Sequence, residues 1–147
     1  EANVVPIKQI TDDNFDFNVN FNRYNFESRD NLEIEIGITK PMYLNIFQLL
    51  PYLDPKDYQA KKLFPNKLET NNYLKSNKTK LPTNGMYRVQ IPKNIDKKNV
   101  VDYLVFIASK EKIEFLNEYT TINDLKKSYL GLKNKVKFKY QQYTIVK

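Results

Sequence analysis

Alternation of apolar and polar residues dominates the first third of the chain. Residues 15–21 and 32–39 each place an apolar side chain at nearly every second position. A period of two puts those side chains on one face of a β-strand. The run Met42–Leu50 is almost continuously apolar, which is typical of a strand covered on both faces. The pattern predicts three strands in this part of the chain.

Shorter patterns predict further strands. Residues 58–64 read as one strand and residues 87–91 as another, which Pro92 ends. Val100–Ala108 is the most continuous apolar segment, and we expect it to be a central strand. Between these segments the polar residues 65–85 predict a long loop that closes in a tight turn at Asn84-Gly85.

The C-terminal region changes its period. Thr121 with Asp124 three residues later is typical of a helix N-terminus, and apolar residues follow at near-helical spacing. This predicts an amphipathic helix over residues 121–134 and a last strand over 135–146. The apolar phase of that strand moves from Val136 and Phe138 to Tyr143 and Ile145, which predicts a β-bulge near Gln141-Gln142.

These elements define a fold class. About seven strands and one late helix, without strand–helix–strand alternation, favour a mainly β fold. We expect an antiparallel β-sandwich, immunoglobulin-like or jelly-roll-like, or a partly open barrel with one late α-helix. The 147 residues suffice for one domain with its own core, so we predict a single domain over 1–147 with residues 1–13 as a lead-in arm.

The amino-acid composition excludes most of the common types of catalytic site. The chain has no Cys and no His, so it lacks thiolate nucleophiles and the commonest general base and transition-metal ligand. Its three glycines stand apart and form no phosphate-binding loop. The sequence therefore predicts no catalytic residue, no metal site and no cofactor, and a protein that is not an enzyme.

Acidic residues offer two weaker alternatives. A carboxylate pair, Glu33 with Glu35 or two of the acids at 12–16, could serve a glycosidase. The oxygen-rich run Asp12-Asp13-Asn14 with Asp16 could hold calcium, although it lacks the glycine and closing glutamate of an EF-hand loop. We favour a solvated turn for the run and an exposed strand face for Glu33 and Glu35.

Positive charge gathers at the C-terminus. Residues 125–147 contain seven lysines and no acid, so this segment alone equals the net charge of +7 of the whole chain. A surface of this kind could bind nucleic acid or an anionic membrane. The alternative, which we favour, is that the lysines solubilise an exposed face and protect an edge strand. The candidate polyanion-binding residues are Lys126, Lys127, Lys133, Lys135, Lys137 and Lys139.

A set of motifs gives the chain a family resemblance. Pro41–Phe47, Leu63-Phe64-Pro65-Asn66, Leu81-Pro82 and Tyr103–Ser109 occur in the order typical of the bacterial domain-of-unknown-function family DUF4384, which this chain resembles over about residues 30–115. Met42 stands where the family usually has glycine. The matching positions are Tyr43, Leu44, Phe47, Leu63, Phe64, Pro65, Asn66, Pro82, Leu104 and Ala108.

The matching residues read as structural. Leu63 and Phe64 are neighbours in a strand, so we expect one to point inward and the other to the opposite side. Pro65 would end the strand and Asn66 would cap the turn. The resemblance supplies no catalytic residue to carry over.

The resemblance also implies a biological setting. It implies a β-rich, non-catalytic module that occurs in envelope-associated proteins and lipoproteins or is appended to kinase-like or peptidase-like domains. We expect a location in the periplasm or cell envelope, with the signal peptide removed. Glu1 would then be a mature N-terminus or a boundary within a longer chain. We expect contact with another envelope protein or a cell-wall component. Nucleic acid is not expected, while peripheral membrane contact stays open. The polar loops 51–57 and 66–80 and the lysine-rich C-terminus are the expected binding places.

Overall fold

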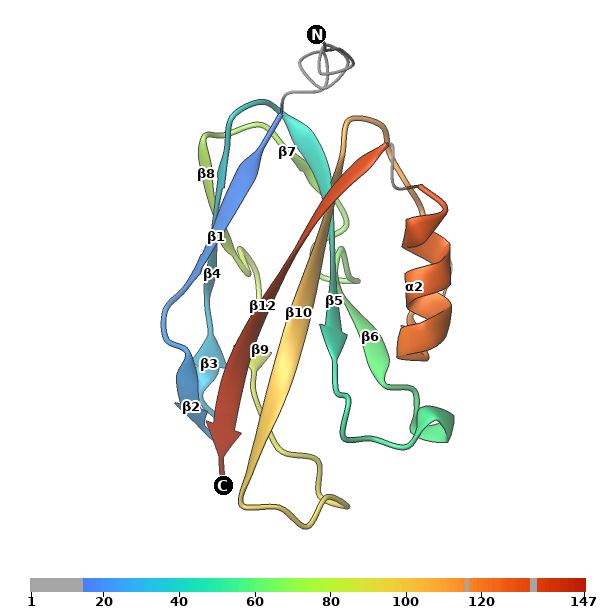
Figure 1. The fold of residues 1–147 in the computed structure, drawn as a ribbon. Helices are drawn as coiled ribbons and strands as arrows, with labels where there is room; N and C mark the ends of the chain where they lie inside the picture. Colours follow the sequence, from blue (N-terminus) through green and yellow to red (C-terminus); the bar gives the residue numbers. More distant parts are fainter. Residues whose placement is uncertain (1–14, 116, 133–134) are drawn as a thin grey trace, which may run out of the picture.

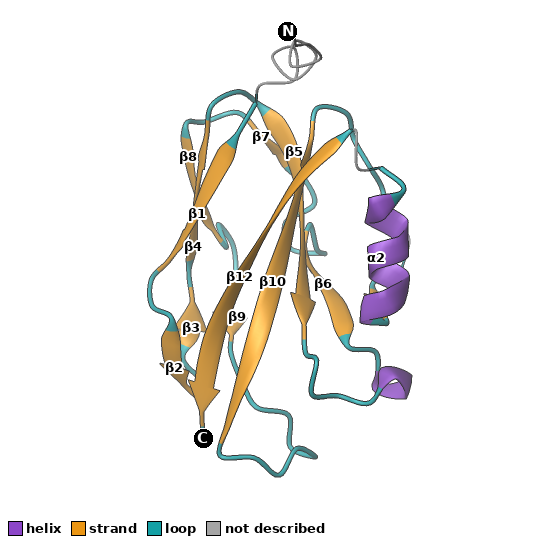
Figure 2. Cartoon of the chain, viewed as in Figure 1, coloured by secondary structure: helices purple, strands orange, loops and turns teal. Residues whose placement is uncertain are grey.

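The computed structural model describes residues 15–115, 117–132 and 135–147. Strands make up nearly half of this part of the chain, and one α-helix lies against one side (Figure 2). Two sheets pack face to face and the helix covers the outer face of the larger one (Figure 1). The prediction of a mainly β sandwich with one late helix is confirmed, and the described strands do not close into a barrel.

The smaller sheet has three strands. They are β1 (Phe17–Phe21), β4 (Ile34–Ile38) and β8 (Lys78–Leu81), in the order β1-β4-β8 with antiparallel pairing. Both β1 and β4 alternate as their sequences predicted, with the apolar side chains directed at the other sheet. β8 lies in the segment predicted to be a long loop. Its polar residues are compatible with a strand because β8 is a sheet edge.

The larger sheet contains seven strands. Its order is β11-β6-β5-β10-β12-β2, with β7 also paired to β5. The contact of β12 with β2 is parallel and the others are antiparallel, so the sheet departs from the purely antiparallel arrangement expected. The bounds are β2 (Asn25–Glu27), β5 (Met42–Leu49), β6 (Ala60–Phe64), β7 (Tyr73–Leu74), β10 (Asn99–Ser109), β11 (Tyr119–Thr120) and β12 (Val136–Val146).

A further pair of short strands closes one end of the sandwich. β3 (Asn31–Leu32) pairs with β9 (Tyr87–Arg88) in an antiparallel two-stranded sheet. Backbone hydrogen bonds between Arg29 and Val89 and between Val89 and Asp30 extend this contact. The segment predicted as a strand over 87–91 is therefore paired only at its start.

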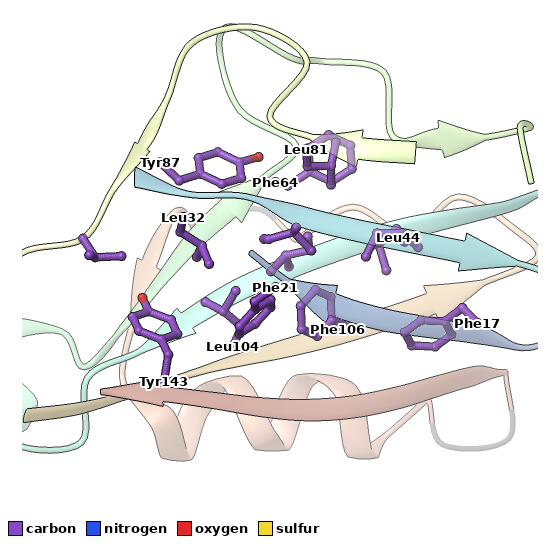
Figure 3. Close-up of a cluster of buried hydrophobic side chains, with 14 of the residues drawn as sticks. Phe17, Phe21, Leu32, Leu44, Phe64, Leu81, Tyr87, Leu104, Phe106 and Tyr143 are labelled. Carbon is purple, nitrogen blue, oxygen red and sulfur yellow. The ribbon is translucent and has the colours of Figure 1, made fainter. Parts of the chain in front are cut away.

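The main core lies between the two sheets. Phe17 and Phe21 from β1 face Leu44 and Phe106 from the larger sheet (Figure 3). Phe64 is also fully buried in this cluster. Tyr143 lies at one end of the cluster and Phe17 at the other (Figure 3). The two ends of the core differ in polarity, because polar side chains occupy inward positions near Tyr143.

A second core lies under the helix α2 (Ile122–Leu130). Leu125 and Tyr129 pack on Phe47 and Val105, which point to the outer face of the larger sheet. The predicted N-cap is present, since the Thr121 hydroxyl accepts a hydrogen bond from the Asp124 amide at 3.0 Å. The helix is shorter than predicted, and residues 133–134 of the predicted span lie outside the described residues. A short 3₁₀ turn, η1 (Pro55–Asp57), follows β5.

The bulge predicted in the last strand is absent. β12 pairs with β10 without a register shift, and Leu104 lies opposite Gln141 in an unbroken ladder. The apolar phase changes because different faces of β12 are covered along its length. Val136 and Phe138 face the helix, whereas Tyr143 and Ile145 face the smaller sheet. A regular strand that passes from one core to the other therefore mimics the pattern of a bulge.

A bulge does occur in β6, where it was not predicted. The register with β5 shifts between Ile46, which pairs with Phe64, and Phe47, which pairs with Lys62. Leu63 is the extra residue, and both Leu63 and Phe64 pack against the main core. The expectation that these two side chains point to opposite sides is therefore wrong. The shift also places Lys61 opposite Gln48, an inward-facing residue.

Candidate functional site

A pocket opens at the end of the sandwich near Tyr143. We call it the end pocket, and its volume is about 270 Å³. Gln48, Lys61, Leu63 and Tyr143 line it from the larger sheet. The opposite wall comes from the short β3–β9 sheet and the residues beside it, namely Leu32, Met86, Tyr87, Arg88 and Val89.

Local structure explains why these side chains converge. Gln48 follows Met42, Leu44 and Ile46 at a spacing of two, so it continues the inward face of β5. Lys61 joins that face because of the bulge at Leu63. Tyr143 lies in the part of β12 whose buried side chains belong to the main core. Its hydroxyl points toward Leu32 and Tyr87 (Figure 3). Inward positions that are apolar elsewhere thus carry polar groups at this end.

A buried carboxylate lies behind the pocket floor. Asp102 is 0% exposed and continues the inward face of β10. Its two oxygens accept hydrogen bonds from the Tyr52 hydroxyl at 2.6 Å, Gln48 Nε2 at 3.2 Å and the Tyr143 hydroxyl at 3.3 Å. Gln48 Nε2 also donates to the Tyr143 hydroxyl at 2.9 Å. The carboxylate is therefore surrounded by protein donors, as a buried charge requires.

Burial changes the acidity of this network. Removal from water raises the pKa of Asp102 to about 6, although the hydrogen bonds from Tyr52, Tyr143 and Gln48 act in the opposite direction. Burial also raises the pKa of Tyr52 and that of Tyr143 above their usual range, and the nearby Asp102 carboxylate adds to both shifts. Both tyrosines therefore stay protonated as donors at neutral pH.

Outside this hydrogen-bond network, the pocket has a few specific polar groups that could bind a ligand. Because Gln48 Nε2 donates within the protein, its amide orientation is fixed and Oε1 is the remaining hydrogen-bonding atom. Lys61 and Arg88 are exposed at the pocket and form no ion pair within residues 15–115, 117–132 and 135–147. The Lys61 ammonium lies 5.8 Å from the Tyr119 ring centroid. The end pocket thus combines two cations, an acceptor and apolar walls.

A second polar cluster stabilises the pocket wall that contains Arg88. Glu69 is buried and accepts hydrogen bonds from the backbone amide of Thr83 at 2.8 Å and from the Thr83 hydroxyl. The Tyr87 hydroxyl donates to Glu69 Oε1 at 3.5 Å. Burial, followed by the charge of Glu69, raises the pKa of Tyr87 above its usual range. This cluster ties the loop 66–69 to the start of β9.

Sequence reasoning missed the central residues of this site. Asp102 interrupts the most apolar segment of the chain, and Gln48 interrupts the apolar run of β5. A polar residue at an inward position of a buried strand is the signal that could have identified both. Arg88 carried no such signal, because its role depends on the pairing of β9 with β3. The loops 51–57 and 66–80, expected as binding places, contribute Tyr52 and Glu69 to the supporting network.

The candidate lysines do not share one surface. Lys126 and Lys127 lie exposed on α2, and Lys135 is exposed before β12, while Lys133 lies outside the described residues. Lys137 and Lys139 lie on the opposite face of the larger sheet from the helix, because they alternate with Val136 and Phe138. The structure therefore separates this set into a helix group and a strand group.

The strand group has structural partners. The Lys139 ammonium donates to the Phe17 carbonyl, lies 5.0 Å from the Phe17 ring centroid and is 3.7 Å from Asp16 Oδ1. The Lys137 ammonium lies 5.5 Å from the Phe15 ring centroid. Cation–π contacts of this kind stabilise exposed sites by about 0.5–1 kcal/mol. These two lysines cover aromatic residues at the side of β1.

The family-motif residues lie mainly in the cores and turns. Tyr43 packs against Tyr73, with ring centroids 4.6 Å apart, and Phe47 packs edge-on against Phe115 at 5.2 Å. Asn66 caps its turn as predicted, because its Oδ1 accepts from the Leu68 and Glu69 amides. Leu44, Leu104 and Ala108 are buried, and Pro65 and Pro82 are half-buried. Only Leu63 of the set lines the end pocket.

The acidic alternatives receive no further support. Asp12, Asp13 and Asn14 lie outside the described residues, and Asp16 is exposed beside Lys139. Glu33 is exposed with Lys80 at 3.9 Å. Within the described ranges, no group of three or more acidic side chains could hold a metal ion. No helix in the described part of the chain is long and apolar enough to cross a membrane.

The fold and motifs define a β-sandwich module, and comparison with known families gives its membership. Residues 25–112 match the family described as a domain of unknown function, DUF4384. The match covers more than half of the chain, so the protein belongs to this family, as its motifs indicated. Comparisons with curated proteins and with solved structures found no match.

Proposed function

We propose that the protein is a non-catalytic binding module of an envelope-associated or secreted bacterial protein. It contacts another envelope protein or a cell-wall component through the end pocket. The observation that carries the proposal is that Lys61, Arg88 and Gln48 all line one concave site. Ligand sites typically combine apolar walls with a few placed polar groups, and this pocket has that composition.

The environment of Asp102 supports binding in preference to catalysis. A perturbed carboxyl in a cleft is often a catalytic candidate. Here Asp102 is fully buried and its oxygens already accept three hydrogen bonds from Tyr52, Gln48 and Tyr143. A general acid or base has to reach the reacting group directly or through one water. Asp102 therefore serves better as a rigid support for the pocket floor.

The test is co-sedimentation of the purified protein with isolated peptidoglycan sacculi, and retention of solubilised envelope proteins on the immobilised protein. The double variant Lys61→Gln/Arg88→Gln removes two charges at the pocket. Lys93→Gln/Lys97→Gln is its matched control, because both lysines are exposed and outside the pocket lining. We expect binding by the wild type and the control at physiological salt, and a loss of binding in the pocket variant.

The alternative, a polyanion-binding surface, has a separate signature. Binding to anionic vesicles or nucleic acid would fall steeply with salt and would depend on Lys126 and Lys127, which are exposed on α2. If vesicle binding is strong and the pocket variant leaves it unchanged, the end pocket is not the functional site.

A further inference from the structure

The end pocket has a directional distribution of polar groups. Its exposed side carries the cationic side chains Lys61 and Arg88. Gln48 lines its floor, and Oε1 is the acceptor that this side chain has left for a ligand, because the amide nitrogen donates to Asp102 and Tyr143. A ligand that satisfies both parts needs a negative group toward the mouth and an N–H donor toward the floor.

The negative charge of Asp102, behind the pocket floor, restricts the class of ligand further. The Asp102 carboxylate lies next to Gln48 and Tyr143, which both line the pocket. A multiply charged group such as phosphate would meet this negative charge if it entered deeply. A single carboxylate held at the rim avoids that repulsion and matches the bidentate geometry of an arginine side chain.

The apolar walls and the volume of the end pocket restrict the size and polarity of the ligand. Leu32, Leu63, Met86 and Val89 supply apolar contact, and Met86 is 64% exposed at the pocket. The volume of about 270 Å³ lies just below the range of about 300–1,000 Å³ for sites that hold a whole drug-sized ligand. The pocket therefore suits the end of a chain with a small apolar side chain.

We propose that the end pocket binds the C-terminal carboxylate of a peptide. Arg88 and Lys61 bind the carboxylate, Gln48 Oε1 accepts the N–H of the terminal residue, and the apolar wall contacts its side chain. This inference rests on the proposed binding function and specifies its ligand class. The peptide could belong to a protein C-terminus or to a cell-wall peptide, which share this chemistry.

The experiment is an NMR titration of the full chain with N-acetyl-Ala-Ala as probe. We expect chemical-shift changes at the Gln48 side-chain amide and at the backbone amides of Leu32 and residues 86–89. The C-terminal amide of the same dipeptide should bind at least tenfold more weakly, because a charge-assisted contact is lost. Inorganic phosphate at equal concentration should not displace the dipeptide. Equal binding of acid and amide, or shifts confined to other residues, would overturn the proposal.

Variants separate the pocket from general charge effects. Arg88→Gln should weaken the acid at least tenfold and leave binding of the amide nearly unchanged, whereas Lys93→Gln should change neither. The all-D form of the dipeptide distinguishes the sources, since D-residues are typical of cell-wall peptides. Tighter binding of the D form indicates a cell-wall peptide, and tighter binding of the L form indicates a protein C-terminus.

Failure of this inference and failure of the proposed function give different results. If the dipeptide does not bind but sacculi or an envelope protein still bind in a manner that depends on Lys61 and Arg88, the ligand class is wrong and the function stands. If neither the dipeptide nor the envelope material binds, both proposals are rejected.

Discussion

Single side chains decide how the two ends of the main core differ. Phe64 fills the apolar part of the sandwich, whereas Asp102 and Gln48 occupy equivalent inward positions at the pocket end. The sequence predicted that one of Leu63 and Phe64 would point inward, and Phe64 is fully buried. The roles of Gln48 and Asp102 were not predictable, because a polar residue in a buried strand has meaning only once its partners on other strands are known.

Truncation of Phe64 should be costly. We expect Phe64→Ala to lower the free energy of unfolding by about 3–5 kcal/mol, through lost burial and the cavity left behind. Denaturant unfolding monitored by circular dichroism measures the change. Leu68→Ala is the control, because Leu68 is 65% exposed and its truncation should change little. An unchanged midpoint for Phe64→Ala would contradict its packing role.

The buried carboxyl should make stability depend on pH. The pKa of Asp102 is about 6 in the folded protein and close to 3.8 when unfolded, so the folded state binds the proton more tightly. The contribution of Asp102 is therefore most favourable below about pH 4 and is lost as the pH rises through about 6. The shift corresponds to roughly 3 kcal/mol at most.

The measurement is the difference between wild type and Asp102→Asn in unfolding free energy from pH 4 to pH 7.5. The other carboxyl groups are common to both proteins and cancel in that difference. We expect the wild type to lose stability relative to the variant as the pH rises. A difference that does not change with pH would show that Asp102 keeps an ordinary pKa.

At the scale of elements, the strand patterns were predictable and their registers were not. The alternation in β1 and β4 and the N-cap of α2 follow from local rules of side-chain direction and backbone capping. The bulge in β6 and the unbroken course of β12 depend on the partner strands β5 and β10. One strand's sequence therefore could not distinguish a bulge from a change in the covered face.

The helix should depend measurably on its cap. Thr121→Ala removes the acceptor for the Asp124 amide and should lower the unfolding free energy by about 1 kcal/mol, within a range of about 0.5–2. Asn123→Ala is the matched control on the same exposed turn. Thermal unfolding of both variants measures the effect. If the control loses as much stability as Thr121→Ala, the cap has no special role.

At the scale of the whole molecule, the positive charge of the C-terminal segment is divided by the sheet. Lys126 and Lys127 extend from the helix layer, whereas Lys137 and Lys139 cover aromatic residues on the other side of the larger sheet. The sequence predicted the amount of charge in this segment. It could not predict the division, because that follows from which face of β12 meets α2.

Charge reversal should therefore have different effects in the two groups. Lys137→Glu/Lys139→Glu should lower the melting temperature, because the variant loses the contacts with Phe15 and Phe17 and adds negative charge beside Asp16. Lys126→Glu/Lys127→Glu, with the same change in net charge, should have a smaller effect. Differential scanning calorimetry at low salt compares the two. Equal losses would show that net charge alone is responsible.

The bulge in β6 keeps the charge of the pocket independent of one residue of chain length. Lys61 and Phe64 are three positions apart and would lie on opposite faces of a regular strand, but the bulge at Leu63 brings both inward. Deletion of Leu63 would leave Lys61 two positions from Phe64, so both side chains would still face inward in a strand without a bulge. A relative could thus gain or lose this one residue and keep its cation at the pocket, whereas a regular strand of the same length would turn Lys61 outward.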